Sequence, residues 1–283
     1  MPERIGYWIL DMELKEREKT ILGAVVEEYI KEAQPISSNF LVENYNFGLS
    51  SATLRLELQK LTKQGYLCQP HTSAGRVPTD KGYRFFIDEL AIPHSLGPEE
   101  EDLIKNFFEQ VKVNLDSDIS AFNRNLIKIM AEISKDLVIV SSLDEEENEV
   151  YYEGVLNLFQ KPEFQEIKQI QGIFKMLEIF RGLSEDFLKE SNDLKAQIQV
   201  FIGKENPFYN TEDYSIIISR SGFSLQRILD RTARIATRNV AGGPEKETEI
   251  FAILGPKRMR YDKNISLLNF IANLKWRMKK IKI

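Results

Sequence analysis

The sequence is poor in cysteine and histidine, with only Cys68, His71 and His94. A single cysteine excludes an internal disulfide and agrees with a reducing compartment. Cys68 and His71 together are too few ligands for a metal site. No apolar run reaches the roughly 18–20 residues that span a bilayer, and residues 6–10 are too short for the core of a signal peptide. We therefore expect a cytoplasmic protein without membrane contact, metal or other cofactor.

Motifs of catalytic and phosphate-binding sites are also missing. Gly203-Lys204 and Gly242-Gly243 do not belong to a Gly-x-x-x-x-Gly-Lys-Ser/Thr loop, and no Gly-x-Ser-x-Gly elbow occurs. Residues 144–149 hold five acids in six positions but lack the glycine and spacing of a calcium loop, so we interpret them as an exposed loop. No catalytic residue is predicted, and the chain is not expected to be an enzyme.

The charge is informative only when it is read locally. The whole chain has a formal net charge of −5, yet residues 50–85 hold six bases against two acids. The stretch from Lys257 to the end holds nine bases and the single acid Asp262. A mildly acidic chain with a concentrated basic window is typical of a protein that contacts phosphates with one face.

The first 90 residues have the pattern of three helices followed by a hairpin. Apolar residues recur at helical spacing, serines stand at helix-start positions, and Gly65 follows the third helical stretch. We expect helices over 14–33 and Ser50–Gln64, with a short helix between them that starts at Ser37 or Ser38. Strands are expected over 66–69 and 76–78. A return to helical periodicity over 83–90 completes a winged helix-turn-helix.

The rest of the chain predicts a mixed helix and sheet domain. Residues 99–136 have the apolar stripe of one long helix or two, and 163–190 and 263–282 are helical. Strands are expected over 137–140, 197–202, 214–218 and 250–254. The fold class is therefore α+β, with a winged helix-turn-helix DNA-binding domain over 1–90, a helical linker over 91–136 and a mixed helix and sheet domain over 137–283.

The third helix carries the first group of candidate DNA-binding residues. A recognition helix presents its N-terminal residues to base edges in the major groove. Arg55 is suited to guanine through a bidentate hydrogen bond, and Lys60 and Lys63 are suited to phosphates. The candidates on this helix are Ser50, Ser51, Thr53, Arg55, Lys60 and Lys63. The alternative is an ordinary solvated helix face, because three-helix units also build protein-interaction modules.

The hairpin tip supplies the second group of candidates. Hydroxyl, imidazole and guanidinium donors lie on a segment rich in turn residues, where they are suited to a minor groove or to the flanking backbone. The candidates are His71, Thr72, Ser73 and Arg76. The alternative for His71 is an exposed loop histidine without a ligand.

Two long stretches of this region resemble a known family. Gly48-Leu49-Ser50-Ser51-Ala52-Thr53-Leu54-Arg55 and the segment from Gln69-Pro70-His71-Thr72-Ser73-Ala74-Gly75-Arg76 to Phe85 are similar to the HrcA heat-inducible transcription repressors. The resemblance continues more weakly through Asn157-Leu158-Phe159, Pro162-Glu163-Phe164, Ile202-Gly203-Lys204-Glu205-Asn206 and the segment from Gly255 to Tyr261.

The resemblance implies properties that the residue pattern does not show. Members of this family repress chaperone operons by binding an inverted-repeat operator as homodimers. A GroEL-type chaperonin assists them, and their GAF-like domain carries an inserted dimerisation domain. They have no known catalytic activity.

The sequence departs from the family at three places. Leu56 stands where the family usually has a polar residue, so the operator sequence is expected to differ. Only about ten residues separate the strand at 137–140 from Tyr151, so the inserted dimerisation domain is missing or reduced. Residues 219–247 are longer and more basic than expected and hold five arginines. We interpret them as a surface helix with a solvated basic face, with contact to DNA or a partner as the alternative.

Two other functions remain open at this level. The chain could be a ligand- or stress-sensing regulator whose C-terminal domain controls DNA binding. It could also be an interaction protein that keeps the winged fold without binding an operator.

Overall fold

A computed structural model describes residues 14–90, 96–113, 119–143, 148–190, 198–206, 212–221 and 248–280. The chain divides into two compact units, Met1–Leu90 and Ala91–Ile283. Helices and antiparallel sheet occur together, in agreement with the predicted mixed class. Among the described residues, no helix is long and apolar enough to cross a membrane.

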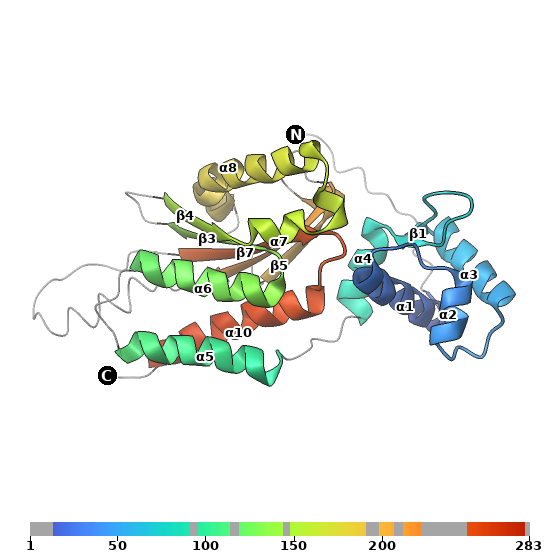
Figure 1. Cartoon of the computed structure of the whole chain (residues 1–283), viewed down its shortest axis with the longest axis horizontal. Coiled ribbons are helices and arrows are strands. Elements are labelled where there is room, and N and C mark those ends of the chain that lie inside the picture. Colours follow the sequence, from blue (N-terminus) through green and yellow to red (C-terminus); the bar gives the residue numbers. More distant parts are fainter. Residues whose placement is uncertain are drawn as a thin grey trace, which may run out of the picture. The chain divides into compact units, whose positions relative to one another are not determined.

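The N-terminal unit consists of helices and one short hairpin (Figure 1). Its elements are α1 (Glu16–Glu32), α2 (Ser38–Asn44), α3 (Ser51–Lys63), β1 (Leu67–Cys68), β2 (Val77–Pro78), α4 (Asp80–Phe85) and the π-helical turn η1 (Phe86–Leu90). The three predicted helices are all present. The antiparallel strands pair Leu67 with Pro78 and Cys68 with Val77, so the hairpin is shorter than predicted.

The ends of α2 and α3 follow from their sequence. Ser37 Oγ accepts a hydrogen bond from Phe40 N at 3.1 Å, and Ser50 Oγ accepts one from Thr53 N at 3.2 Å, so each serine satisfies an amide that the helix leaves unpaired. Gly65 adopts φ +80°, which permits Tyr66 N to donate to Leu61 O at 3.0 Å and end α3. Ser37 rather than Ser38 is therefore the cap of α2.

The core of this unit lies between α1 and α3. Ile21, Leu22, Val25 and Val26 of α1 are fully buried, as are Leu54 and Leu61 of α3, while Leu58 is 3% exposed. Burial of each such side chain contributes about 1.5–3 kcal/mol. Because the leucines of α3 occupy one side of the helix, the opposite side is left toward solvent.

The C-terminal unit is built on a five-stranded antiparallel sheet in the order β4-β3-β7-β6-β5. The strands are β3 (Leu137–Leu143), β4 (Asn148–Glu153), β5 (Ile198–Ile202), β6 (Tyr214–Ser221) and β7 (Thr248–Pro256). Successive residues of β3 and β7 are buried on opposite faces, and Leu137 lies opposite Leu254 in the register. The central strands are therefore apolar on both faces.

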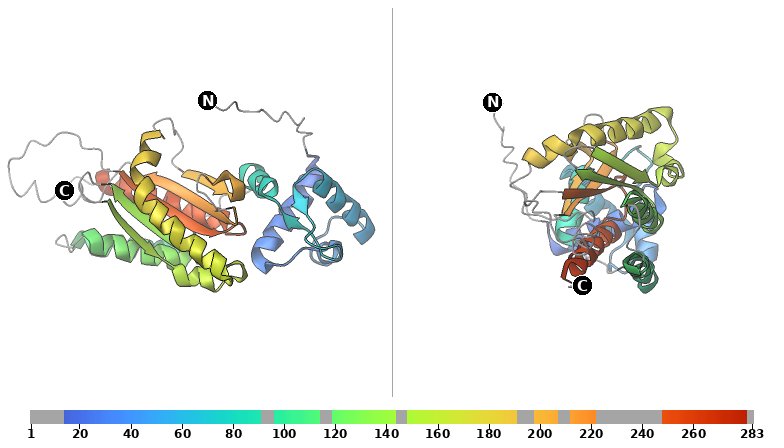
Figure 2. Two further views of the ribbon diagram at one scale, coloured as in Figure 1. Left: turned by 90° about the horizontal axis from the view of Figure 1, so that it is seen from above. Right: turned by 90° about the vertical axis from the view of Figure 1, so that its left-hand side faces the viewer.

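Helices cover both faces of this sheet, as the right-hand panel of Figure 2 shows. Helix α8 lies on one face, and α6 and α10 lie on the other, with α5 packed against α6. The helices are α5 (Pro98–Val113), α6 (Ile119–Ser134), α7 (Val155–Phe159), α8 (Ile167–Glu190) and α10 (Tyr261–Lys280), with short 3-10 turns η2 (Pro162–Phe164) and η4 (Gly203–Glu205). The stretch 99–136 is thus two helices rather than one.

Two elements of this unit were not predicted. Strand β4 includes residues 148–149, which the acidic pattern placed in an exposed loop, and α7 follows it directly. In the described part of the sheet, β4 is an edge strand that pairs with β3 alone, so it needs few apolar residues and gives a weak sequence signal. Of the basic segment 219–247, the first three residues end β6, and 222–247 lie outside the described residues.

Candidate nucleic-acid interface

A hollow of about 640 Å³ opens on the N-terminal unit between α2, α3 and the loop 69–76 that joins β1 to β2. It is bordered by polar side chains from all three segments. Its lining residues from α3 are Ser51, Ala52, Arg55, Leu56, Leu58 and Gln59; those from the loop are Gln69, Thr72, Ser73, Ala74, Gly75 and Arg76. The N-terminal end of α2 adds Ser38 and Asn39. The hollow therefore brings together α3 and the loop, the two segments that hold the predicted candidates, and adds the start of α2, which held none.

The exposed side of α3 faces this hollow. Ala52, Arg55, Leu56 and Gln59 are all exposed and follow the spacing i, i+3, i+4 and i+7, which places them on one helix face. In the part of the chain that the structure describes, no hydrogen bond or ion pair engages the Arg55 side chain. Its guanidinium is thus available to a ligand.

Five of the ten predicted residues meet at the hollow: Ser51, Arg55, Thr72, Ser73 and Arg76. Two others, Ser50 and Thr53, stand beside it at the start of α3, where their hydroxyl oxygens are 3.0 Å apart. Lys63 is exposed in the last turn of α3, and His71 is exposed in the loop. These four side chains do not line the hollow.

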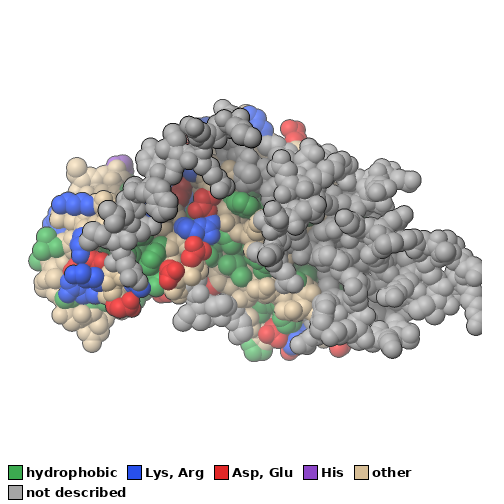
Figure 3. Space-filling view, turned by 180° about the vertical axis from the view of Figure 1, so that it is seen from behind, with side chains coloured by type: hydrophobic (Ala, Val, Ile, Leu, Met, Phe, Trp, Pro, Cys, Tyr) green, Lys and Arg blue, Asp and Glu red, His purple; other side chains and the backbone are tan. Residues whose placement is uncertain are grey.

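Lys60 faces α1 instead of the hollow. Its ammonium group forms an ion pair with Glu18, whose side chain is only 3% exposed. Arg17 of α1 forms a second ion pair with Glu57 of α3. Figure 3 shows one face of this unit, on which basic side chains lie next to acidic ones. Part of the basic excess over residues 50–85 is therefore paired within the protein.

Arg76 lies mainly inside the loop and is 9% exposed. Its Nε donates to Thr62 Oγ1 at 3.0 Å, and one Nη donates to Gly75 O at 3.4 Å. Burial lowers the pKa of this guanidinium, and the positive charge of Arg55 lowers it further. The two arginines are thus close enough to repel, which concentrates positive potential at the hollow.

The loop 69–76 is held in a defined shape. Gln69 Nε2 donates to the carbonyl oxygens of Thr72 and Ala74, each at 2.9 Å. Ile36 and Arg76 exchange two backbone hydrogen bonds of 2.9 and 2.7 Å. A Cβ on Gly75 would lie 2.4 Å from backbone atoms of Ile36, so this close approach requires glycine. The tip that carries Thr72 and Ser73 is therefore tied to the start of α2.

Sequence reasoning did not include several residues of this surface among the candidates. Ala52, Leu56 and Gln59 belong to the exposed face of α3, Ser38 and Asn39 to the start of α2, and Gln69 to the loop. Ser51 Oγ lies 3.1 Å from Ser38 Oγ and also donates to Asn39. The face opposite Leu54, Leu58 and Leu61 would have identified Ala52, Leu56 and Gln59 from the helical period alone.

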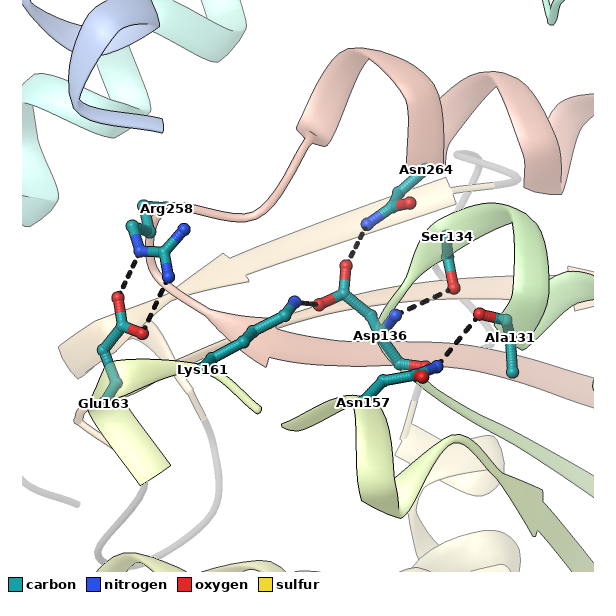
Figure 4. Close-up of polar contacts among 8 residues, drawn as sticks. All are labelled: Ala131, Ser134, Asp136, Asn157, Lys161, Glu163, Arg258 and Asn264. Atoms are coloured by element: carbon teal, nitrogen blue, oxygen red, sulfur yellow. Dashed lines mark hydrogen bonds and ion pairs between the residues drawn. The ribbon is translucent and has the colours of Figure 1, made fainter. Parts of the chain in front are cut away.

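A second polar cluster lies in the C-terminal unit and joins segments far apart in the sequence (Figure 4). Asp136, 1% exposed, forms an ion pair with Lys161 and accepts a hydrogen bond from Asn264 Nδ2 at 2.8 Å. Burial raises the pKa of Asp136, although the positive charge of Lys161 opposes this. Arg258 forms a two-nitrogen ion pair with Glu163 nearby.

This cluster fastens the turn after β7 and the start of α10 to β3 and α7. Asn157 Nδ2 donates to Ala131 O at 3.1 Å, which adds the end of α6. Gly255 passes so close to Asp136 that a Cβ there would lie 2.4 Å from its carboxylate oxygen. The arrangement has no exposed nucleophile, and the described residues contain no group of three or more His, Cys, Asp or Glu that could hold a metal ion. The contacts of the cluster hold α6, α7, β3 and α10 together.

Comparison with known proteins places the chain among transcription repressors. Residues 100–265 match the family model described as HrcA protein C terminal domain, which is more than half of the chain. The chain therefore belongs to the HrcA family, as the sequence predicted.

Curated relatives support this assignment over most of the chain. The heat-inducible transcription repressor HrcA of Thermoanaerobacter pseudethanolicus is 27% identical over 91% of this chain and 95% of its own length. That of Moorella thermoacetica is 39% identical over 40% of this chain and 33% of its own. A crystal structure described as a hypothetical protein shares the fold, with a TM-score of 0.69, 18% identity and coverage of 94% and 98%.

Proposed function

We propose that the chain represses transcription by binding a specific DNA sequence, with α2 and α3 as a helix-turn-helix and the loop 69–76 as a wing. One observation carries the proposal: Ala52, Arg55, Leu56 and Gln59 form a single exposed face of α3 beside a rigid loop with polar side chains. A helix with such a face fits the major groove. Family membership supports repression as the outcome.

Each side chain of this surface has a role that its chemistry suggests. Arg55 is suited to the O6 and N7 acceptors of guanine, and Gln59 to N6 and N7 of adenine. Thr72 and Ser73 at the wing tip are suited to the sugar-phosphate backbone, as is Lys63. Arg76 and Lys60 act differently from the other candidates, because the first holds the loop and the second pairs with α1.

We further propose that the protein acts as a homodimer on an inverted repeat in the cytoplasm. One short helix per half-site gives little affinity, and two half-sites about one helical turn apart match a two-fold axis. The alignment with the Thermoanaerobacter relative spans 349 positions although this chain has 283 residues. The chain therefore lacks residues that this relative has, which supports a reduced inserted domain. The family resemblance alone suggests the GAF-like domain, the chaperone operons and the chaperonin partner.

The test measures DNA affinity of the full chain and its variants by fluorescence anisotropy. The probes are the duplex upstream of the chaperone operon in the source genome and a scrambled duplex of equal length. Arg55→Ala is expected to lose about 1–3 kcal/mol on the first probe and little on the second. Equal losses on both probes, or none, would remove Arg55 as a base-reading residue.

Two lysines provide matched controls on the same helix. Lys63→Ala should weaken both complexes evenly and reduce the slope of log affinity against log salt by about 1. Lys60→Ala should leave that slope unchanged, since its partner is Glu18. Absence of any preference of the wild-type chain for the operon probe would contradict the proposed function.

A further inference from the structure

The exposed face of α3 carries two rows of side chains with different chemistry. Ala52 and Leu56, four residues apart, form an apolar row, and Arg55 and Gln59 form a polar row beside it. All four line the same hollow. Apolar groups and hydrogen-bonding groups therefore face the same space side by side.

Leu56 is not explained by the core of the N-terminal unit. Its side chain is 65% exposed, whereas Leu54 and Leu58, on the inward side of the same helix, are at most 3% exposed. Among the described residues of this unit, Val42 is the one other large exposed hydrophobic, at 40%. Single exposed leucines are common in proteins, so the informative feature is the position of Leu56 beside two side chains suited to base edges.

We propose that Leu56 contacts the 5-methyl group of a thymine and so requires a T·A pair at one position of each half-site. This inference rests on the proposed function. The thymine methyl is the apolar group that the major groove presents. Cytosine carries only a hydrogen at the same carbon, so Leu56 would lose this apolar contact, and purines present hydrogen-bonding groups there that a leucine cannot satisfy.

The geometry of the helix limits where this thymine lies. Adjacent residues of a helix differ by about 1.5 Å along its axis, and stacked bases are about 3.4 Å apart on each strand. The contacts of Arg55 and Leu56 therefore fall within about one base step of each other. The half-site should contain a guanine and a thymine on neighbouring pairs, on the same strand or on opposite strands.

The test isolates the methyl group. A duplex that the full-length wild-type chain selects from random-sequence DNA is synthesised with each thymine in turn replaced by deoxyuridine, which differs from it by that methyl. At one position, which occurs symmetrically in both half-sites, the replacement of thymine by deoxyuridine should weaken wild-type binding about fourfold per half-site. This change corresponds to about 0.8 kcal/mol. Leu56→Ala should bind both duplexes equally at that position. Val42→Ala, a matched truncation outside the hollow, should keep the fourfold difference.

The outcomes separate this inference from the function on which it rests. A sequence-specific complex indifferent to every thymine methyl would overturn the role of Leu56 and leave the proposed function in place. The same would follow if Leu56→Ala kept the full deoxyuridine effect at every position. Failure of the wild-type chain to select any sequence would overturn the proposed function and the inference together.

Discussion

The Nε of Arg76 donates a 3.0 Å hydrogen bond to Thr62 Oγ1, so the loop between β1 and β2 is joined to the last turns of α3. Thr62 Oγ1 in turn donates to Leu58 O at 2.8 Å. The hydroxyl thus serves as acceptor for the arginine and donor to its own helix. The loop and the proposed reading helix are therefore connected through side chains as well as through the backbone.

Replacement of Arg76 by alanine tests this connection. Arg76→Ala should lower the free energy of unfolding by about 1–3 kcal/mol, because it removes a largely buried hydrogen bond and its packing. It should also weaken binding to operator and scrambled DNA equally. Urea unfolding and anisotropy measure the two effects, with the exposed Arg55→Ala as the stability control. Weaker DNA binding with unchanged unfolding would show instead that Arg76 contacts DNA itself.

Glycine 75 tests how tightly the loop is bound to the start of α2. Gly75→Ala places a methyl 2.4 Å from backbone atoms of Ile36, and relief of this overlap must stretch the two Ile36–Arg76 hydrogen bonds. We expect the free energy of unfolding to fall by about 1–3 kcal/mol. Hydrogen exchange should become faster at the backbone amides of Ile36 and Arg76. Thr72→Ala, at the exposed tip of the same loop, should leave stability unchanged. Unaltered exchange in Gly75→Ala would contradict the close approach.

The Glu18–Lys60 pair predicts a pH dependence of stability. Burial alone would raise the pKa of Glu18, but hydrogen bonds from Lys60 and from the Lys15 amide outweigh it and lower the pKa. The folded state therefore binds this proton less readily than the unfolded state, whose pKa is near 4.3. The stabilisation is present above that value and is lost as the pH falls through the lower folded pKa.

Substitution of Glu18 measures this contribution. Glu18→Gln should lower the free energy of unfolding by about 1–2 kcal/mol at pH 7. This value is reduced by the partial exposure of Lys60. The loss should shrink as the pH approaches 3. Urea unfolding from pH 7 to 3 would detect it, with Glu16→Gln as the exposed control on the same helix. A loss that stays constant over this range would argue against the ion pair.

The buried Asp136–Lys161 pair predicts the opposite pH dependence of stability. Burial raises the pKa of Asp136, so the folded state retains its proton to higher pH, and stability falls as the pH rises through the folded pKa. Lys161→Met removes the neutralising partner and should cost about 3–5 kcal/mol at pH 7. The variant should regain stability toward pH 5 as Asp136 takes up a proton.

A double substitution provides the matched control for this pair. Asp136→Asn combined with Lys161→Met removes both charges, so it should be more stable at pH 7 than Lys161→Met alone and should show no recovery on acidification. Thermal melting at both pH values measures the difference. Equal stabilities of the single and double variants at pH 7 would contradict a buried unpaired carboxylate as the cause.

Local sequence signals were sufficient for much of the N-terminal unit. Ser50 and Gly65 mark the start and end of α3 because capping depends on hydrogen bonds within a few residues. The stripe of Leu54, Leu58 and Leu61 set the inward face for the same local reason. The central strands of the sheet were also predicted, since each is apolar on both faces.

Long-range pairing gave no comparable signal. Lys60 and Arg76 look like free cations in the sequence, and their partners Glu18 and Thr62 are 42 and 14 residues away. The sequence gives no sign of the Asp136 cluster, because Lys161 and Asn264 come to Asp136 from other elements, 25 and 128 residues along the chain. Edge strand β4 has too few apolar residues to stand out.

The sequence by itself determined the three N-terminal helices, the apolar strands and the membership of the HrcA family, because helix caps, periodicity and motif matches depend on neighbouring residues. The tertiary structure alone decided which cations remain available to a ligand and which hold the protein together. An ion pair is formed by whatever carboxylate the fold brings within reach, and no local pattern encodes that distance.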